Sequence, residues 1–250
     1  MEWEKWYLDA VLVPSALLMM FGYHIYLWYK VRTDPFCTIV GTNSRARRSW
    51  VAAIMKDNEK KNILAVQTLR NTIMGGTLMA TTCILLCAGL AAVLSSTYSI
   101  KKPLNDAVYG AHGDFTVALK YVTILTIFLF AFFSHSLSIR FINQVNILIN
   151  APQEPFSDDF GEIGSFVTPE YVSELLEKAF LLNTVGNRLF YMGLPLMLWI
   201  FGPVLVFLSS ALIIPVLYNL DFVFLLSNKE KGKVDCNGDT RFQVNGVILI

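Results

Sequence analysis

The sequence predicts an all-α protein, a multi-pass bundle of transmembrane helices. Of its 250 residues, 54% are hydrophobic and only 16% are charged, whereas soluble domains carry about 25% charged residues. The hydrophobic residues also lie in blocks long enough to cross a bilayer, which needs roughly 20 apolar residues in a helix. We therefore expect an integral membrane protein whose main partner is the lipid bilayer.

Charge, cysteines and motifs exclude several other classes. The formal net charge is +1, and nucleic-acid binding requires a basic face, so we expect no nucleic-acid partner. The four cysteines are scattered, and two of them lie inside an apolar run, which argues against a disulfide framework. The motifs of serine hydrolases, zinc proteases, phosphate loops and dinucleotide-binding folds do not occur. We expect no enzymatic activity, no cofactor and no bound metal.

Three spans can be placed directly, over about residues 8–29, 72–98 and 121–139. The first span has Trp and Tyr residues at both ends, which matches the preference of amphipathic aromatic rings for the headgroup level. We treat residues 1–226 as a single transmembrane domain and residues 227–250 as a polar, flexible tail.

The fourth apolar block, residues 190–226, is too long for one straight span and contains three prolines that can kink a helix. We expect a span over about 190–212, followed by an apolar segment in the membrane interface. The alternative is that the chain folds back and makes a fifth pass. That alternative would bring Asn183, Asn187 and Arg188 into the fourth helix, which costs a few kcal/mol.

Basic residues predict the orientation of the chain. Nine Lys and Arg residues lie between 30 and 71, against three between 98 and 120. By the positive-inside rule, the N-terminus is outside and residues 30–71 are cytoplasmic. Four spans then place the C-terminus outside, although three lysines follow the last apolar block, which favours five spans. We expect the plasma membrane rather than an internal membrane.

Two segments are predicted to form cytoplasmic helices, over about 44–71 and 168–189. The first lacks Pro and Gly and should run continuously into the second span, and residues 30–71 carry a net charge of +6. The second begins with Thr168 as an N-cap and Pro169 at N1, and residues 140–189 carry a net charge of −4. The opposite charges would allow the two segments to dock on each other and cap the bundle. The alternative is that the basic segment only sets topology and touches anionic lipid.

Polar residues gather where the second, third and fourth spans meet the cytoplasm, and we expect them at one depth. They either bond neighbouring helices together or line a polar mouth. His135 is the exception of interest, because an ionisable group inside a span is a functional candidate. The candidate polar cluster is Arg70, Asn71, His135, Arg140, Asn143, Asn146, Asn183, Asn187 and Arg188.

Small residues form one face of the second span. Faces of this kind permit close helix approach, so we expect this one to pack helices and to support a homo-oligomer. Its members are Gly76, Ala80, Cys83, Cys87 and Ala91.

Three stretches are distinctive: AVQTLRNTIM at 65–74, FSHSLSIRFIN at 133–143 and LNTVGNRLFY at 182–191. They resemble a family of plant and bacterial membrane proteins known as domain of unknown function 599. The resemblance covers about residues 5–225. It implies a plant membrane protein and brings no activity, substrate or site residue, although the three stretches coincide with the polar cluster.

The leading functional hypothesis is a small oligomeric channel or transporter-like protein with a polar cytoplasmic mouth. Asn143, Asn146, Asn187 and His135 would line the mouth, and its arginines would favour an anion. The alternative is a non-catalytic scaffold whose cytoplasmic loops recruit a protein partner. A third hypothesis, lipid handling, would use the interfacial segment over residues 213–226.

Overall fold

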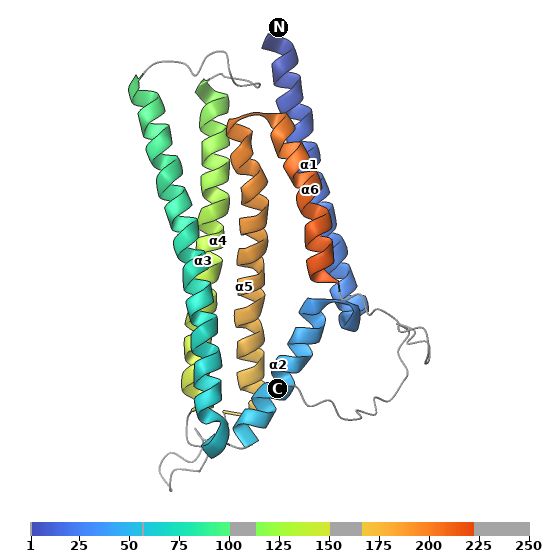
Figure 1. The fold of residues 1–250 in the computed structure, drawn as a ribbon, viewed down its shortest axis with the longest axis vertical. Coiled ribbons are helices and arrows are strands. Elements are labelled where there is room, and N and C mark those ends of the chain that lie inside the picture. The colour runs from blue at the N-terminus through green and yellow to red at the C-terminus, as the bar shows by residue number, and fades with distance from the viewer. Residues whose placement is uncertain (1, 57, 101–113, 151–166, 223–250) are drawn as a thin grey trace.

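The structure, a computed structural model, describes residues 2–56, 58–100, 114–150 and 167–222, and it is helical throughout these ranges apart from short connections (Figure 1). No strand occurs in them, which confirms the all-α prediction. The tail predicted over 227–250 lies outside the described residues. The helices are α1 (Glu2–Thr33), η1 (Pro35–Cys37), α2 (Ile39–Lys56), α3 (Asn58–Ile100), α4 (Asp114–Ile149), α5 (Pro169–Met197), η2 (Leu198–Ile200) and α6 (Pro203–Asp221).

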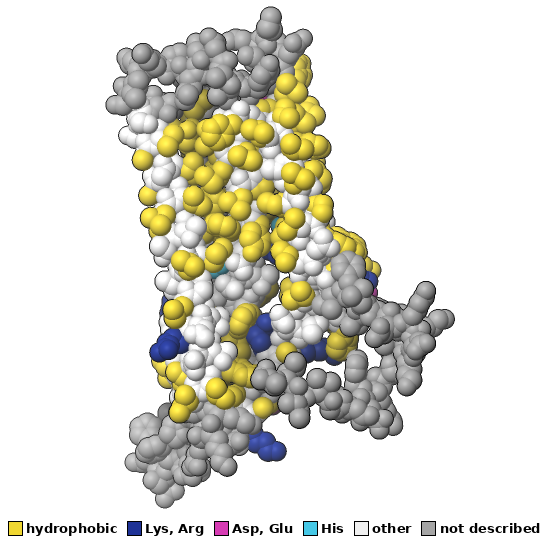
Figure 2. All heavy atoms as spheres, viewed as in Figure 1, with side chains coloured by type: hydrophobic (Ala, Val, Ile, Leu, Met, Phe, Trp, Pro, Cys, Tyr) yellow, Lys and Arg dark blue, Asp and Glu magenta, His cyan; other side chains and the backbone are white. Residues whose placement is uncertain are grey.

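Four helices are long and apolar enough to cross a membrane, and three of them confirm the first three predicted spans. The four segments are Tyr7–Thr33, Ile63–Ser96, Thr116–Ile149 and Pro203–Asp221. Hydrophobic side chains cover the upper part of the face drawn in Figure 2, whereas Lys and Arg side chains appear there only in the lower half. An apolar outer wall of this kind suits contact with lipid, and the chain is an integral membrane protein.

The prediction of one span over about 190–212 is wrong. Helix α5 continues to Met197, one turn of 3₁₀ helix follows, and α6 begins at Pro203. Gly202 has φ 154°, a backbone conformation that residues other than glycine rarely adopt. Proline suits the first turn of a new helix. The Gly202–Pro203 pair therefore ends one helix and starts the next, and α6 runs back beside α1 (Figure 1).

Helix α5 lies beside α4 and runs along the same axis as the four apolar helices (Figure 1). The chain therefore passes along the bundle five times. Helix α5 is less apolar than the others because Asn183, Asn187 and Arg188 lie in its middle. These are the side chains that the five-pass alternative brings into the bundle.

Helix α2 lies at the end of the bundle where α3 and α5 begin, which we call the α2 end; the opposite end is the far end (Figure 1). An apolar core joins α2 to the bundle there, formed by Val51, Ile54, Met55, Ala65, Leu69, Ile142, Val145, Ile149, Val172, Leu175, Leu176 and Ala179. Arg47 of α2 also donates two hydrogen bonds of 2.9 Å to the two carboxylate oxygens of Glu177 on α5. Of the two alternatives for the oppositely charged segments, the structure shows the docked one.

The helix predicted over about 44–71 is divided between α2 and α3, and only its second part, from Asn58, runs continuously into the second span. The different directions of α2 and α3 allow the apolar face of α2 to reach α5. The sequence has no proline or glycine where the chain changes direction between α2 and α3. Packing of the apolar face of α2 therefore outweighs the local preference for one straight helix. The predicted start of α5 is confirmed: the Thr168 hydroxyl accepts a hydrogen bond of 3.2 Å from the backbone N–H of Tyr171.

Helices α3 and α4 pack through the small-residue face of α3. Ala80, Cys83 and Cys87 are buried, the Cys87 thiol lies 3.8 Å from the carbonyl oxygen of Leu125, and Gly76 faces Ile139. The predicted role in helix packing is thus fulfilled within one chain. Because α4 already covers this face and only Ala91 is exposed, the face does not offer the predicted surface for a second copy.

Candidate functional site

The residues of the predicted polar cluster do not meet in one place. The side chains of Arg70, Asn71, Arg140 and Asn143 are exposed on α3 and α4. Asn146 is half-buried, and its carbonyl accepts a hydrogen bond of 2.6 Å from the Asn150 side chain one turn further on. Among the described residues, no hydrogen bond or ion pair joins these five side chains to one another, so the structure does not bring the nine predicted members together in one site.

His135 and Asn183 do meet, at the interface between α4 and α5. Nδ1 of His135 lies 3.1 Å from the side-chain oxygen of Asn183, and the His135 side chain is fully buried. One turn further along α4, the Ser138 hydroxyl donates a hydrogen bond of 2.7 Å to the carbonyl of Ala179. Polar bonds of this kind hold membrane helices together, each contributing roughly 0.6–2 kcal/mol.

Glycines on α5 let the two helices approach closely at this interface. A Cβ atom on Gly186 would lie 2.7 Å from Nε2 of His135, and one on Gly193 would lie 2.8 Å from Cζ of Phe128. Among the described residues, Nε2 of His135 has no hydrogen-bond partner, but the backbone of α5 covers it. The interface is closed, and we assign it a packing role.

Arg188, also on α5, belongs to a different group. It forms an ion pair with Asp221 at the end of α6, and the Tyr23 hydroxyl of α1 donates a hydrogen bond of 2.5 Å to the other carboxylate oxygen of Asp221. The side chains of Arg188 and Asp221 are 18% and 6% exposed. Three helices thus bring a charged pair and a tyrosine together inside the bundle.

His24 lies beside this group, near enough to Arg188 and Asp221 to interact with their charges. Its ring centroid lies 5.4 Å from that of Tyr23, and both ring nitrogens are buried without a hydrogen-bond partner among the described residues. A buried polar atom without a partner is costly, so an uncommitted imidazole beside an ion pair requires a reason. We call Tyr23, His24, Arg188 and Asp221 the junction cluster, since they lie where α1, α5 and α6 adjoin.

A second buried ion pair lies toward the far end of the bundle. Lys120 of α4 lies 3.5 Å from Asp9 of α1, with both side chains 7% exposed. The indole N–H of Trp199 in η2 donates a hydrogen bond of 2.8 Å to Asp9, and the Lys120 ammonium lies 5.6 Å from the centre of the Trp199 ring. Helix α1 is therefore attached to the bundle by charged contacts at two levels.

Of the residues in these two groups, the predicted cluster contains only Arg188; it lacks Asp9, Tyr23, His24, Lys120, Trp199 and Asp221. One signal was available, because Asp221 is the only charged residue between 190 and 226, and an ionisable residue within an apolar block is a functional candidate. Asp9 and Lys120 lie at the edges of apolar runs, where charged residues are ordinary. Tyr23 resembles a member of the aromatic belt.

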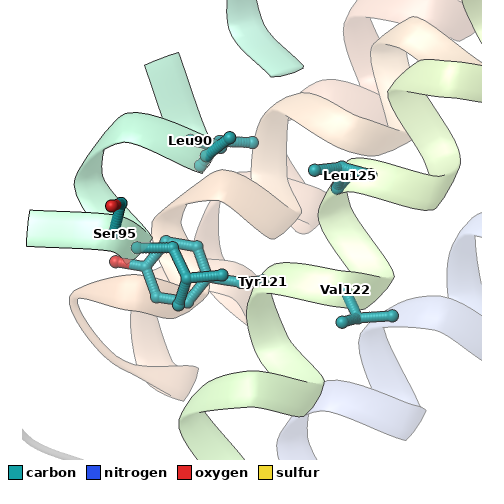
Figure 3. A pocket seen from close by; sticks show the side chains of 7 residues that line it. Leu90, Ser95, Tyr121, Val122 and Leu125 are labelled. Carbon is teal, nitrogen blue, oxygen red and sulfur yellow. The ribbon is translucent and has the colours of Figure 1, made fainter. Parts of the chain in front are cut away.

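An apolar groove of about 310 Å³ lies between α3 and α4 (Figure 3). It is lined by Leu90, Ala91, Leu94, Ser95, Tyr121, Val122 and Leu125. Its lining carries little polar surface and no ionisable group other than Tyr121, so we place no chemistry there. Within the described ranges, no three His, Cys, Asp or Glu side chains come together in a way that could hold a metal ion.

Fold and site together define a polytopic helical membrane protein with charged residues buried between its helices. The family model described as protein of unknown function, DUF599, matches residues 11–225, and the chain belongs to this family. No curated protein and no solved structure matches it.

Proposed function

We propose that the chain is a non-catalytic, transporter-like membrane protein, and that the junction cluster is the site through which it moves a small ion or solute. The observation that carries the proposal is the Arg188–Asp221 pair buried between three helices. Replacing a buried ion pair by apolar side chains is often neutral or stabilising. Apolar side chains could therefore join these helices equally well, and helix packing alone does not explain the pair. Ionisable groups inside the membrane commonly mark ion pathways.

Protons are the ion that this cluster suits best. The sequence alone suggested an anion, because three arginines were expected at one mouth. Arg70 and Arg140 are instead exposed, and Arg188 is neutralised by Asp221. What remains is the Asp221 carboxylate, the Tyr23 hydroxyl bonded to it, and the His24 imidazole, whose ring nitrogens have no hydrogen-bond partner among the described residues. Each of these groups can accept or release a proton. We accordingly propose proton-coupled transport.

The proposed orientation places the N-terminus outside and the α2 end in the cytoplasm of a plasma-membrane protein. The α2 end carries the basic segment that the positive-inside rule assigns to the cytoplasm. With α5 as a fifth pass, α6 ends facing the same side, so the lysines that follow it also satisfy the rule. The conflict that four spans created therefore disappears.

The test is flux from liposomes that contain the purified protein, across a panel of small anions and cations and with a pH-sensitive dye inside. The matched variant is Arg188→Gln/Asp221→Asn, which removes both charges and keeps side chains of similar size. We expect proton-dependent flux from the natural protein and at least a tenfold loss in the double variant at equal folded yield. Equal flux from both proteins, or no flux from the folded natural protein, would overturn the proposal.

A scaffold is the second candidate, and a groove of about 610 Å³ between α2 and α5 favours it. Arg48, Ala52, Pro169, Glu170, Ser173 and Glu174 line this groove. Glu177 already binds Arg47, whereas Glu174 pairs only with Lys178 at a mostly exposed position on the same helix, so Glu170 and Glu174 are the acids that can face a cytoplasmic protein. If reversing both charges abolishes partner recovery while the protein shows no flux, the scaffold replaces the transporter.

A further inference from the structure

The connection between α1 and α2 is a compact elbow, which we define as residues 28–45. Thr38 is fully buried, and its hydroxyl donates to the carbonyl of Pro35 at 3.2 Å and accepts from the N–H of Gly41 at 3.2 Å. The latter bond caps the first turn of α2. A Cβ atom on Gly41 would overlap the backbone of Pro35, so this tight turn requires glycine.

The elbow is also fixed to the end of the last helix. Thr38 forms an isolated antiparallel bridge with Phe222, directly after α6. The ring centroids of Tyr26 and Phe222 lie 6.0 Å apart. The elbow is therefore held at a set depth relative to α1 and α6, both of which are apolar enough to cross the membrane.

Aromatic side chains of the elbow point outward. Trp28 is 58% exposed, Tyr29 62% and Phe36 60%. Exposed aromatic rings at the end of a span belong at the headgroup level, where their apolar and polar parts are both accommodated. This position puts the elbow at the bilayer surface on the side of the α2 end.

Two arginines lie over these rings. The guanidinium carbon of Arg32 lies 4.0 Å from the centre of the Trp28 ring, and that of Arg45 lies 4.0 Å from the centre of the Phe36 ring. In the part of the chain that the structure describes, neither arginine has an acidic partner. Arg47 binds Glu177, and the acid of the elbow itself, Asp34, binds Lys30.

We propose that the elbow is a binding site for an anionic phospholipid, with the guanidinium groups of Arg32 and Arg45 directed at its phosphate and headgroup oxygens. A guanidinium group that lies over a ring can still donate hydrogen bonds from its N–H groups to oxygen atoms. The planar set of N–H donors suits the oxygens of a phosphate group. The exposed rings supply the apolar contact with the acyl chains beside the headgroup. This inference is independent of the proposed transport function.

The test uses full-length protein in phosphatidylcholine vesicles with increasing fractions of phosphatidylserine whose acyl chains are brominated. Bromine quenches tryptophan fluorescence on contact, and the loss of quenching in Trp28→Phe identifies the signal from the elbow. We expect stronger quenching by brominated phosphatidylserine than by brominated phosphatidylcholine. Each basic residue near an anionic membrane contributes roughly fivefold to association, so Arg32→Gln/Arg45→Gln should lower the preference by an order of magnitude.

The matched control is Arg48→Gln/Lys56→Gln, which removes two exposed positive charges from α2 outside the elbow. It should keep the preference, and Arg32→Lys/Arg45→Lys should retain part of it. Equal quenching by the two lipids, or an equal loss in both glutamine variants, would overturn the proposal. Displacement by millimolar inorganic phosphate alone, without dependence on the lipid, would also overturn it and indicate a site for a soluble anion.

Discussion

The two histidines that the structure describes within the helices, His24 and His135, lie in different surroundings. His135 is fully buried, bonds to Asn183 and is covered by the backbone at Gly186. His24 lies among Tyr23, Arg188 and Asp221, and neither ring nitrogen has a hydrogen bond among the described residues. The comparison shows that an ionisable residue in a membrane helix is not in itself a sign of function. A functional role is indicated only when the surroundings of the residue leave its polar atoms without hydrogen-bond partners and beside other ionisable groups.

Small residues explain why the α4–α5 interface is closed. Ala179, Gly186 and Gly193 occur along one side of α5 and are buried, so α4 can approach until side chains contact backbone. The junction of α1, α5 and α6 is built instead from long polar side chains, Arg188 and Tyr23, that meet Asp221. One region is held by close packing, whereas the other is built around a buried charged pair.

The largest expected effect comes from breaking the charged pair. Asp221→Asn leaves Arg188 as an uncompensated charge inside the bundle, which should lower the free energy of unfolding by about 3–5 kcal/mol. Arg188→Gln/Asp221→Asn should recover most of that loss, because no buried charge remains. Thermal unfolding of both variants in detergent measures this. Equal destabilisation of the single and the double variant would show that the pair has no electrostatic role in stability.

Gly186→Ala should give the next largest effect. The new Cβ atom would lie 2.7 Å from Nε2 of a fully buried His135, and overpacking of this kind costs about 1–3 kcal/mol. Gly75→Ala is the control, since nothing lies within 4 Å of its added Cβ atom and alanine favours helix. If both variants unfold at the same temperature, the α4–α5 interface is looser than the structure shows.

A smaller effect is expected at the contact between α2 and α5. Arg47→Ala removes two hydrogen bonds to Glu177 and a stacking contact of 4.3 Å with Phe180, and the loss should be about 1 kcal/mol at this partly exposed site. Lys178→Ala removes an ion pair whose side chains are both more than half exposed and should change stability by less than about 0.5 kcal/mol. Unfolding in denaturant distinguishes the two. A greater loss for Lys178→Ala would contradict the docking contact.

Local features of the fold could be predicted from the sequence, and contacts between distant helices could not. Hydropathy identifies the first three spans, and the Thr168–Pro169 pair marks the start of α5, because both signals lie within one segment. The meeting of Arg188 with Asp221 depends on the reversal at Gly202. Placing one span across that reversal removes Asp221 from the bundle, so the error in the fourth span also concealed the junction cluster.

Polar residues near one another in depth can still face different directions. Asn183 and Arg188 lie five residues apart on α5, yet one faces α4 and the other faces α6. The depth of a residue in the membrane follows from the span boundaries. The direction in which its side chain points depends on how the helix is rotated about its axis, and packing against neighbouring helices sets that rotation. The sequence therefore identified Arg188 and His135 as candidates but wrongly placed them in one cluster.

Proton flux from vesicles containing His24→Gln or His135→Gln tests the central claim most directly. Both changes replace an imidazole by an amide, at the half-buried His24 of the junction and at the fully buried His135 of the α4–α5 interface. We predict that His24→Gln loses at least tenfold in proton flux with nearly unchanged stability, whereas His135→Gln is less stable and keeps its flux per folded molecule. Loss of flux in His135→Gln with normal flux in His24→Gln would contradict the assignment of transport to the junction and of packing to the interface.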